Sequence, residues 1–459
     1  MKRRQKEAVN RRATIRQPLG RLLVLTGIAI VLASCGTIMP ASPIPRTPAA
    51  QPTQGSGYTV FNVKDYGAKA DGKTDDGAAI QSAVGAAIKA GGGTVYLPGG
   101  TYLVDPTKGT IAIPGNDITL AGDGGTIIET PSKLSYPAGT SIMVLLSGSQ
   151  DAVHDIHFIG PASFTGTGGS IMVSVTAGAF QPHVYDIECS SINGGGDAGG
   201  DCIDTYQPQT VDHSYQYGRF ENVYIHDSPH ATAIIATSSG NIFDKIRISN
   251  IGVLNTQHGF YISGGDNVIS NSTIAGVSGW GVQIYPGSSS EDLTGNRIIG
   301  TTFRDNKAGN FNIVAGDTNV GGVPAVGHGV NLTRATVIDD DHFFYTSPSA
   351  TFPVTGWSVG SPIIVTNSII EGDLVATKGP CIAHGNIFND TGFGRTGLNC
   401  GPGSVVSGNS FNFGKGPADG IAIGPNSIFE GNVGNVALSS ILTSDSTDIF
   451  QNNVFTPVK

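Results

Sequence analysis

Short runs of apolar residues, separated by glycine and asparagine, recur along most of this 459-residue chain. One set of runs aligns on its third residue at intervals of 31, 26, 22 and 29 residues: Asp204, Ile235, Tyr261, Gln283 and Asn312. A second set begins with asparagine: Asn241, Asn267 and Asn296. Irregular intervals of this length, each holding two or three strands, are typical of stacked coils in a solenoid. The pattern therefore predicts an all-β fold, a right-handed parallel β-helix.

The same pattern predicts how the coils are built. Isoleucine, valine and phenylalanine stack inward, and asparagines at the corners form a ladder of side-chain amides. Later runs continue the stack, beginning at Asn367, Gly385, Gly408, Asn426 and Asn452. Residues 317–361 lack the pattern and are expected to protrude as a loop. An antiparallel sandwich is disfavoured, because the pattern repeats by coil and lacks Asn-Gly hairpin turns of fixed length.

The segment before the coils predicts a strand, a short helix and a second strand. Phe61 and Val63 alternate as in a strand, and Thr94 to Pro98 read as the next one. Between them Thr74-Asp75-Asp76 supplies an N-cap for a helix over 75–90, and three glycines end it. The apolar side of that helix is expected to consist of Ile80, Val84 and Ile88. The helix would cap the first coil and cover its open edge.

This strand–helix–strand opening resembles the start of the pectate-lyase-like superfamily over residues 61–102. That superfamily includes polygalacturonases, rhamnogalacturonases, polysaccharide lyases, alginate epimerases and phage tailspikes. The resemblance implies one β-helix domain over residues 58–459 and a polysaccharide as its partner. It specifies the fold more firmly than the reaction.

Residues 1–35 are typical of a bacterial lipoprotein signal peptide. A basic stretch precedes the apolar run from Leu22 to Ala33, which is too short to span a bilayer. The run ends in Leu32-Ala33-Ser34-Cys35-Gly36, which resembles a lipobox and predicts a lipid-modified Cys35. Residues 36–57 are rich in proline and predict an extended tether. We therefore expect an exported protein, anchored through lipid to the membrane of the cell envelope.

Composition limits which binding partners and which disulfides are expected. Glycine, with 66 residues, indicates many turns, and the net charge of −9 argues against nucleic acid binding. The cysteines of the exported domain are Cys189, Cys202, Cys381 and Cys400. Four thiols allow three connectivities, and nearness in sequence favours Cys189–Cys202 and Cys381–Cys400. The sequence favours no particular oligomeric state.

Candidate chemistry gathers where alternate strand residues point outward. Asp204, Tyr261, Gln283 and Asn312 share one outward position, and Asp201, His258 and Trp280 come three residues earlier in their runs. The segment 199–204 resembles the Gly-Asp-Asp-Cys-Ile signature of polygalacturonases, and His258-Gly259 resembles their His-Gly motif. The chain departs from that family because Gly200 stands where adjacent acids are usual, and because the Asn-Thr-Asp and Arg-Ile-Lys motifs are not recognisable.

The leading hypothesis is hydrolysis of an acidic polysaccharide containing uronate or rhamnose. Such hydrolysis needs two carboxyl groups, and Asp201 and Asp204 are the candidates for acid and base, in either order, with His258 beside them. Residues three apart in a strand are roughly 10 Å apart, which is compatible with an inverting pair. Substrate contacts are expected from Tyr261, Trp280, Gln283, Tyr285, Lys245 and Arg247. The alternative reading makes Asp201 and Asp204 ordinary surface acids.

Two other functions stay open. A lyase would need a cationic base, for which Lys245 and Arg247 are candidates, and could use Ca²⁺ held by Asp197, Asp201 and Asp204. A non-catalytic glycan-binding or envelope protein would need only stacked aromatic side chains. The hydrolase hypothesis requires no cofactor or metal, and the acidic run Asp339–His342 is interpreted as a solvated loop.

Overall fold

A computed structural model of the chain describes residues 59–456. The gaps within this range are 137–138, 177, 196–198, 206–214, 286–292, 294, 314–334, 345–353, 357–362, 372, 377–379, 390–396, 414–419, 437–440 and 444–447. The predicted signal peptide with Cys35, the tether 36–57 and Asp197 lie outside the described residues. Within them, no helix combines the length and apolar character needed to cross a membrane.

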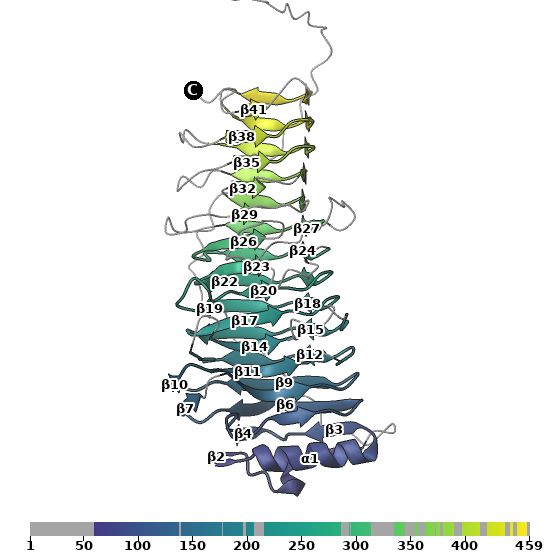
Figure 1. Ribbon diagram of the computed structural model, residues 1–459, viewed down its shortest axis with the longest axis vertical. Helices are drawn as coiled ribbons and strands as arrows, with labels where there is room; N and C mark the ends of the chain where they lie inside the picture. The colour runs from purple at the N-terminus through teal and green to yellow at the C-terminus, as the bar shows by residue number, and fades with distance from the viewer. Residues whose placement is uncertain are drawn as a thin grey trace, which may run out of the picture. The chain divides into compact units, whose positions relative to one another are not determined.

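The described strands form parallel sheets in which each strand pairs with its counterpart one coil further along the chain (Figure 1). A 13-stranded sheet forms the first face: β5 (Ile111–Ile113), β8 (Thr140–Leu146), β11 (Gly169–Val175), β14 (Gly200–Asp204), β17 (Ala231–Ala236), β20 (Phe260–Ile262), β23 (Trp280–Ile284), β26 (Gly309–Ile313), β29 (Val354–Gly356), β32 (Asp373–Ala376), β35 (Gly397–Cys400), β38 (Gly420–Ile423) and β41 (Ile441–Thr443).

A 28-stranded sheet forms the other two faces, which the long strands β6 (Ile118–Glu129) and β9 (Ala152–Ile159) join. The second face contains β1 (Val60–Asn62), β3 (Gly93–Tyr96), β12 (His183–Tyr185), β15 (Arg219–Glu221), β18 (Ile242–Asp244), β21 (Val268–Ser270), β24 (Arg297–Ile299), β27 (Thr336–Asp339), β30 (Ile363–Thr366), β33 (Cys381–His384), β36 (Val405–Ser407), β39 (Ile428–Glu430) and β42 (Ile449–Gln451).

The third face contains β2 (Asp71–Asp75), β4 (Gly100–Leu103), β13 (Glu188–Ser190), β16 (Tyr224–Ser228), β19 (Arg247–Ile251), β22 (Thr273–Val277), β25 (Thr302–Arg304), β28 (His342–Phe344), β31 (Ile369–Glu371), β34 (Ile387–Asn389), β37 (Ser410–Asn412), β40 (Val433–Asn435) and β43 (Val454–Thr456). A separate pair, β7 (Lys133–Tyr136) and β10 (Ser163–Gly166), lies outside both large sheets. These sheets confirm the predicted right-handed parallel β-helix.

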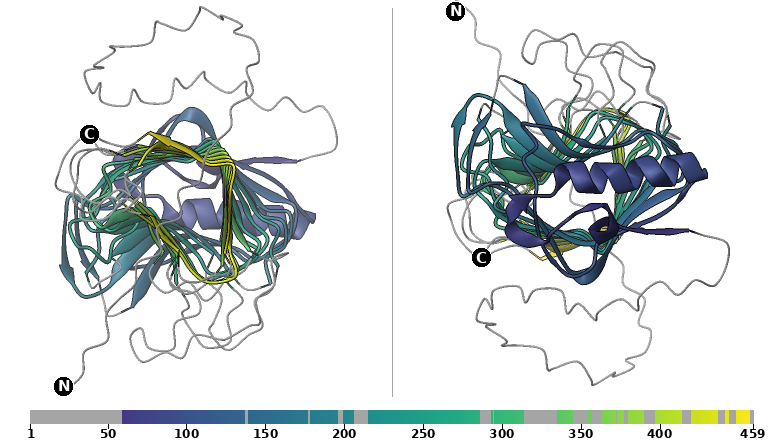
Figure 2. Two further views of the ribbon diagram at one scale, coloured as in Figure 1. Left: turned by 90° about the horizontal axis from the view of Figure 1, so that it is seen from above. Right: turned by 90° about the horizontal axis from the view of Figure 1, so that it is seen from below.

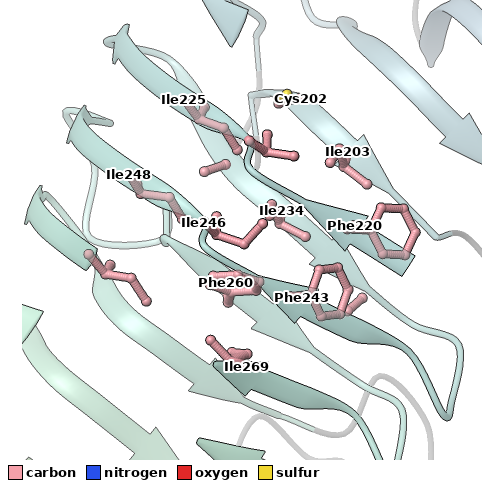
Figure 3. Close-up of a cluster of buried hydrophobic side chains, with 14 of the residues drawn as sticks. Cys202, Ile203, Phe220, Ile225, Ile234, Phe243, Ile246, Ile248, Phe260 and Ile269 are labelled. Carbon is pink, nitrogen blue, oxygen red and sulfur yellow. The ribbon is translucent and has the colours of Figure 1, made fainter. Parts of the chain in front are cut away.

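The predicted alignment of the runs is the pairing register of the sheets. Asp204 pairs with Ile235, Ile235 with Tyr261, and the series continues through Gln283 and Asn312. Identical positions in successive coils therefore stack, and their inward side chains form a continuous core (Figure 3). Phenylalanine rings stack within it, as between Phe220 and Phe243, whose centroids are 4.8 Å apart. Such burial of large apolar side chains stabilises the stack.

The N-terminal helix crosses the end of the first coil, as expected (Figure 2). The structure has a 3-10 helix η1 (Val63–Tyr66) and the helix α1 (Gly77–Ala90), which ends at Gly91 with a φ of 83°.

Two details of the sequence prediction are corrected. Asp76 is the N-cap residue, but its carboxylate accepts hydrogen bonds from the backbone N–H groups of Lys69 and Ala70 instead of capping the helix.

The second correction concerns the buried side of α1. Ile80 and Val84 are fully buried as predicted, whereas Ile88 is 37% exposed. Ala83 and Ala87 complete the buried surface in its place. Small side chains on this side let the helix lie close to the first coil.

Polar side chains at the corners accept hydrogen bonds from backbone N–H groups one coil away. In one corner Oδ1 of Asn267 accepts from the backbone N–H of Asn241, and Oδ1 of Asn296 accepts from that of Asn267, each at 3.0 Å. A second corner uses a longer series of the same kind: Asp341, Ser368, Asn386, Asn409, Asn432 and Asn453. These buried backbone groups would otherwise lack partners, because the chain turns there. We call the two series the corner ladders.

Part of the segment 317–361, which was predicted to protrude as a loop, belongs to the stack of coils. Residues 314–334, 345–353 and 357–362 lie outside the described residues, but β27, β28 and β29 belong to the large sheets. The acidic run is likewise no solvated loop: Asp341 is 2% exposed and accepts a hydrogen bond from the backbone N–H of Thr301. The sequence did not reveal this corner, because Asp341 occupies a position that other coils fill with serine or asparagine.

We expect the corner ladders to stabilise the fold measurably. Asn267→Ala removes the acceptor for the buried backbone N–H of Asn241 and should lower the free energy of unfolding by about 1–3 kcal/mol. Denaturant unfolding would measure the change. Asn412→Ala is the matched control, because the amide of the exposed Asn412 donates to the side chain of Asn389 on the surface and serves no buried backbone group among the described residues. Equal losses in the two variants would contradict the ladder's role.

A second expectation concerns pH. Burial and the nearby charges of Asp339 and Asp340 raise the pKa of Asp341 to about 8, although two backbone hydrogen bonds lower it. The folded state therefore holds a proton that the unfolded state loses near pH 4, so the free energy of unfolding falls as pH rises between about 4 and 8.

Asp341→Asn supplies the amide that neighbouring coils use and should remove this contribution to the pH dependence. At pH 8 the variant should be more stable than the wild type, on the order of 1–3 kcal/mol, with little difference at pH 4. Unfolding midpoints at the two pH values measure both quantities. A pH slope that is unchanged by the substitution would refute the assignment.

Candidate active site

The first face carries a bend that brings residues three apart to the same surface. In β14 two consecutive side chains, Cys202 and Ile203, are fully buried in the core, and the pairing with β11 and β17 skips Cys202. Residues three apart in a regular strand point to opposite faces. Because both intervening residues face inward here, the flanking Asp201 and Asp204 lie together on the outer side.

The bend recurs in neighbouring coils and gives two adjacent columns. The first column consists of Asp201, Thr232, His258 and Trp280. The second consists of Asp204, Ile235, Tyr261, Gln283 and Asn312. The rings of His258 and Tyr261, one from each column, stack with centroids 6.0 Å apart, as expected for neighbours on one surface. The columns run across β14, β17, β20, β23 and β26, which follow one another in Figure 1.

The two carboxyl groups are the least ordinary feature of these columns. Asp201 and Asp204 are each 5% exposed, and within the described part of the chain Oδ1 of each has no hydrogen-bond partner. Burial raises the pKa of Asp204 to about 7. Burial, and then the charge of Asp204, raise the pKa of Asp201 well above its usual range. Both carboxyl groups therefore hold a proton more tightly than an exposed aspartate does, and the charge of one affects the titration of the other.

The environment of His258 argues for a neutral ring. His258 is 8% exposed, and burial lowers its pKa to about 4. Its Nδ1 accepts a hydrogen bond of 3.0 Å from the backbone N–H of Trp280, so the ring proton is on Nε2. A ring in this state can donate a hydrogen bond but is a poor general base. The state of the ring therefore favours hydrogen-bond donation from Nε2, and not proton abstraction, as the role of His258.

The remaining predicted contacts of the columns cluster around Tyr261. The rings of Tyr261 and Tyr285 are 6.1 Å apart, and Tyr285 follows β23 directly. Gln283 is buried and accepts a hydrogen bond of 2.9 Å from the amide of Asn312. Aromatic side chains beside a few placed polar groups are the usual lining of a ligand-binding site.

The disulfide Cys189–Cys202 holds β14 against β13. Its Cα atoms are 5.9 Å apart, and both side chains are fully buried. Cys202 lies between the two aspartates, so the link ties the bend to the third face. Cys381 and Cys400 form a second disulfide, with Cα atoms 5.5 Å apart. Both are the local pairs that nearness in sequence favours.

Lys245 and Arg247 do not belong to this surface, contrary to expectation. Lys245 precedes β19, and Arg247 lies on β19, a strand of the third face. The guanidinium of Arg247 lies over the ring of Tyr224, 4.5 Å from its centroid. The sequence did not place them, because spacing along the chain does not say which face of a coil a residue occupies.

The sequence also missed an aromatic group beside β14. Tyr136 on β7, Phe164 on β10 and His230 form a chain of ring contacts of 6.2 and 5.4 Å. The hydroxyl of Tyr136 donates to Oγ of Ser170 on β11, and the carbonyl of His230 accepts from the backbone N–H of Gly200, next to Asp201. No repeat marks β7 and β10, which explains why the pattern did not reveal them.

The chain belongs to the family described as rhamnogalacturonase A/epimerase, pectate lyase-like, whose model matches residues 60–309. This confirms the resemblance of the opening segment. The description of this family names polysaccharide-active enzymes.

Individual relatives match shorter stretches. Alginate lyase 7 of Azotobacter vinelandii is 55% identical over 74 residues, which is 15% of this chain and 9% of that protein. Mannuronan C5-epimerase AlgE3 of the same organism is 54% identical over 74 residues, 15% of this chain and 4% of that protein. The matched segment thus spans less than a tenth of either relative.

Among solved structures, the A-module of Azotobacter vinelandii mannuronan C-5 epimerase AlgE6 has a TM-score of 0.55 and 18% identity. The similarity covers 87% of this chain and 100% of that module. The pre-mature gene product 12 of bacteriophage phi29 has a TM-score of 0.50 and 16% identity, over 86% of this chain and 55% of that protein. At these identities the similarity shows the fold alone.

Proposed function

We propose that the protein is an enzyme that cleaves an acidic polysaccharide bound along the two columns of the first face. The observation that carries the proposal is the pair Asp201 and Asp204, buried side by side on the outer side of one bend with raised pKa values. Paired carboxyl groups whose proton affinities differ are the usual means by which a glycosidase obtains an acid and a base.

In this proposal Asp201 is the acid and Asp204 the base. Asp201 gives its proton to the glycosidic oxygen as the bond from that oxygen to the anomeric carbon breaks. Asp204 takes a proton from water, whose oxygen bonds to the same carbon. The straight-strand separation of roughly 10 Å between the Cα atoms is an upper limit, because the bend shortens it. His258 donates from Nε2 to a sugar hydroxyl, and Tyr261 and Trp280 contact the sugar rings.

The local identity with an alginate lyase and with mannuronan epimerases supports a second candidate. On a uronate polymer, a neutral Asp201 would donate a hydrogen bond to the substrate carboxylate, and ionised Asp204 would remove the proton on the adjacent carbon. In elimination, the bond from the next carbon to the glycosidic oxygen then breaks and that oxygen takes a proton from water. In epimerisation, a proton from water instead bonds to the opposite face of the deprotonated carbon. The two candidates share the residues and differ in the product.

The product separates them. We would incubate the full chain with alginate, polygalacturonate and rhamnogalacturonan and follow reducing ends, ultraviolet absorbance and proton exchange into the polymer. Reducing ends without absorbance indicate hydrolysis, and reducing ends with absorbance indicate elimination. Exchange without cleavage indicates epimerisation. If none of the polymers reacts, the proposal of an enzyme acting on acidic polysaccharides fails in favour of a binding protein.

Substitution of either carboxyl group should abolish most of the activity on whichever polymer reacts. Asp201→Asn and Asp204→Asn should each lower kcat by roughly 10²–10⁴-fold, the usual contribution of a general acid or base. Asp151→Asn is the matched control, because Asp151 is also buried with a pKa raised to about 7 but lies outside the columns. Activity that survives in Asp201→Asn and Asp204→Asn would place the reaction elsewhere.

The pH dependence should report the same pair. Asp204 acts in its ionised form, so kcat/KM should rise with pH and level off above about 7, the raised pKa of this group. It should fall again at higher pH, where Asp201 loses its proton. Initial rates over the pH range on the free enzyme measure both limbs. A rising limb near pH 4 would show that an ordinary carboxylate is the base.

A further inference from the structure

The third face carries three potential metal ligands that the columns do not involve. His157 on β9, Glu188 on β13 and His226 on β16 come from three successive coils. Each offers one ligand atom, and these atoms lie within 4.8 Å of one another. We call these residues the His157–Glu188–His226 cluster.

Register explains why the three side chains converge. His157 pairs directly with Glu188 in the parallel ladder, and Ser190, two residues after Glu188, pairs with His226. All three side chains are mostly buried, with exposed fractions of 21%, 11% and 17% for His157, Glu188 and His226. The cluster is therefore built into the sheet and is not a chance approach of mobile surface groups.

We propose that the His157–Glu188–His226 cluster binds a divalent transition-metal ion of the zinc class. Two imidazole nitrogens and one carboxylate oxygen are the ligand set of open zinc sites, which leave a fourth position for water. Ligands of a tetrahedral zinc ion are about 3.3 Å apart, given bonds near 2.0 Å. Oε1 of Glu188 is already 3.1 Å from Nε2 of His226 and 3.4 Å from Nε2 of His157.

The surroundings of the cluster fit this role. Nδ1 of His226 is 2.8 Å from a carboxylate oxygen of Asp227, the carboxylate–histidine arrangement that orients a metal ligand. Stacking on Tyr224, with ring centroids 4.3 Å apart, fixes the same imidazole. The two negative charges of Glu188 and Asp227 exceed the single positive charge of Arg247, whose guanidinium lies over the ring of Tyr224. The local charge therefore favours a cation.

Without a metal, hydrogen bonds hold the cluster together. His226 contacts Asp227 through Nδ1 and Glu188 through Nε2, at 2.8 and 3.1 Å, and Oγ of Ser190 lies 2.9 Å from Nε2 of His157. A bound ion would replace the contacts of the two Nε2 atoms and leave the contact between Nδ1 of His226 and Asp227 in place.

Metal analysis of the full chain tests the proposal, which does not rest on the proposed function. After treatment with a chelator, the wild type should take up one equivalent of Zn²⁺ by dialysis, with a rise in Tm that saturates at that ratio. Glu188→Gln and His226→Gln should lose the bound zinc, and Asp227→Asn should weaken binding by roughly 10–100-fold. His183→Gln is the control, because His183 pairs with Glu221 on the second face and is not part of the cluster.

Chemical modification locates the ion without any substitution. Bound zinc should protect His157 and His226 from diethyl pyrocarbonate, as mapped by mass spectrometry, and leave the reaction of His183 unchanged. Tm values measured in chelator would show that the variants are folded. The proposal is overturned if the wild type takes up no zinc, or if zinc protects neither histidine. It is equally overturned if a folded Glu188→Gln or His226→Gln variant retains the ion.

Discussion

The parallel pairing of each coil with the next is the constraint on which the rest of this protein depends. Equivalent residues in successive coils stand about 4.8 Å apart, so any side chain meets its counterpart above and below. On the inside this stacks phenylalanine on phenylalanine. At the corners, where the chain turns and backbone N–H groups lose their strand partners, the same stacking brings a polar side chain to each of them.

The outer surface follows from the same rule. On the first face, the bend points two consecutive side chains inward, so the residues on either side of them lie next to each other on the outer surface. Repetition of the bend in neighbouring coils lines up these outer residues as two columns. On the third face, the pairing that places His157 beside Glu188 also sets His226 next to them. The columns and the His157–Glu188–His226 cluster thus combine residues of successive coils that lie far apart in sequence. This is why a β-helix can carry separate sites on separate faces.

This logic also decides what could be predicted from the sequence. The register from Asp204 to Asn312 was predictable, because apolar and polar positions repeat within each run. The place of Lys245 and Arg247 was not, because coil length varies and spacing alone does not identify the face. The His157–Glu188–His226 cluster was not predicted for a related reason: a single histidine or glutamate in a strand carries no signal until the strands are aligned. The exposure of Ile88 shows a further limit of prediction from sequence, because helical spacing does not say which turn of α1 the first coil leaves uncovered.

Raised pKa values do not by themselves mark the functional carboxyl groups of this fold. Burial raises the pKa of Asp151 and Asp341 as it does for Asp201 and Asp204. The first two serve the corners, since Oδ1 of each accepts a backbone N–H from the neighbouring coil. Asp201 and Asp204 instead stand on the outer side of the bend, in the columns that His258 and Tyr261 occupy two coils further along. The buried carboxyl group of a corner aspartate thus serves the fold through its bond to a backbone N–H, whereas two adjacent carboxyl groups on the outer side of a bend are placed to meet a substrate.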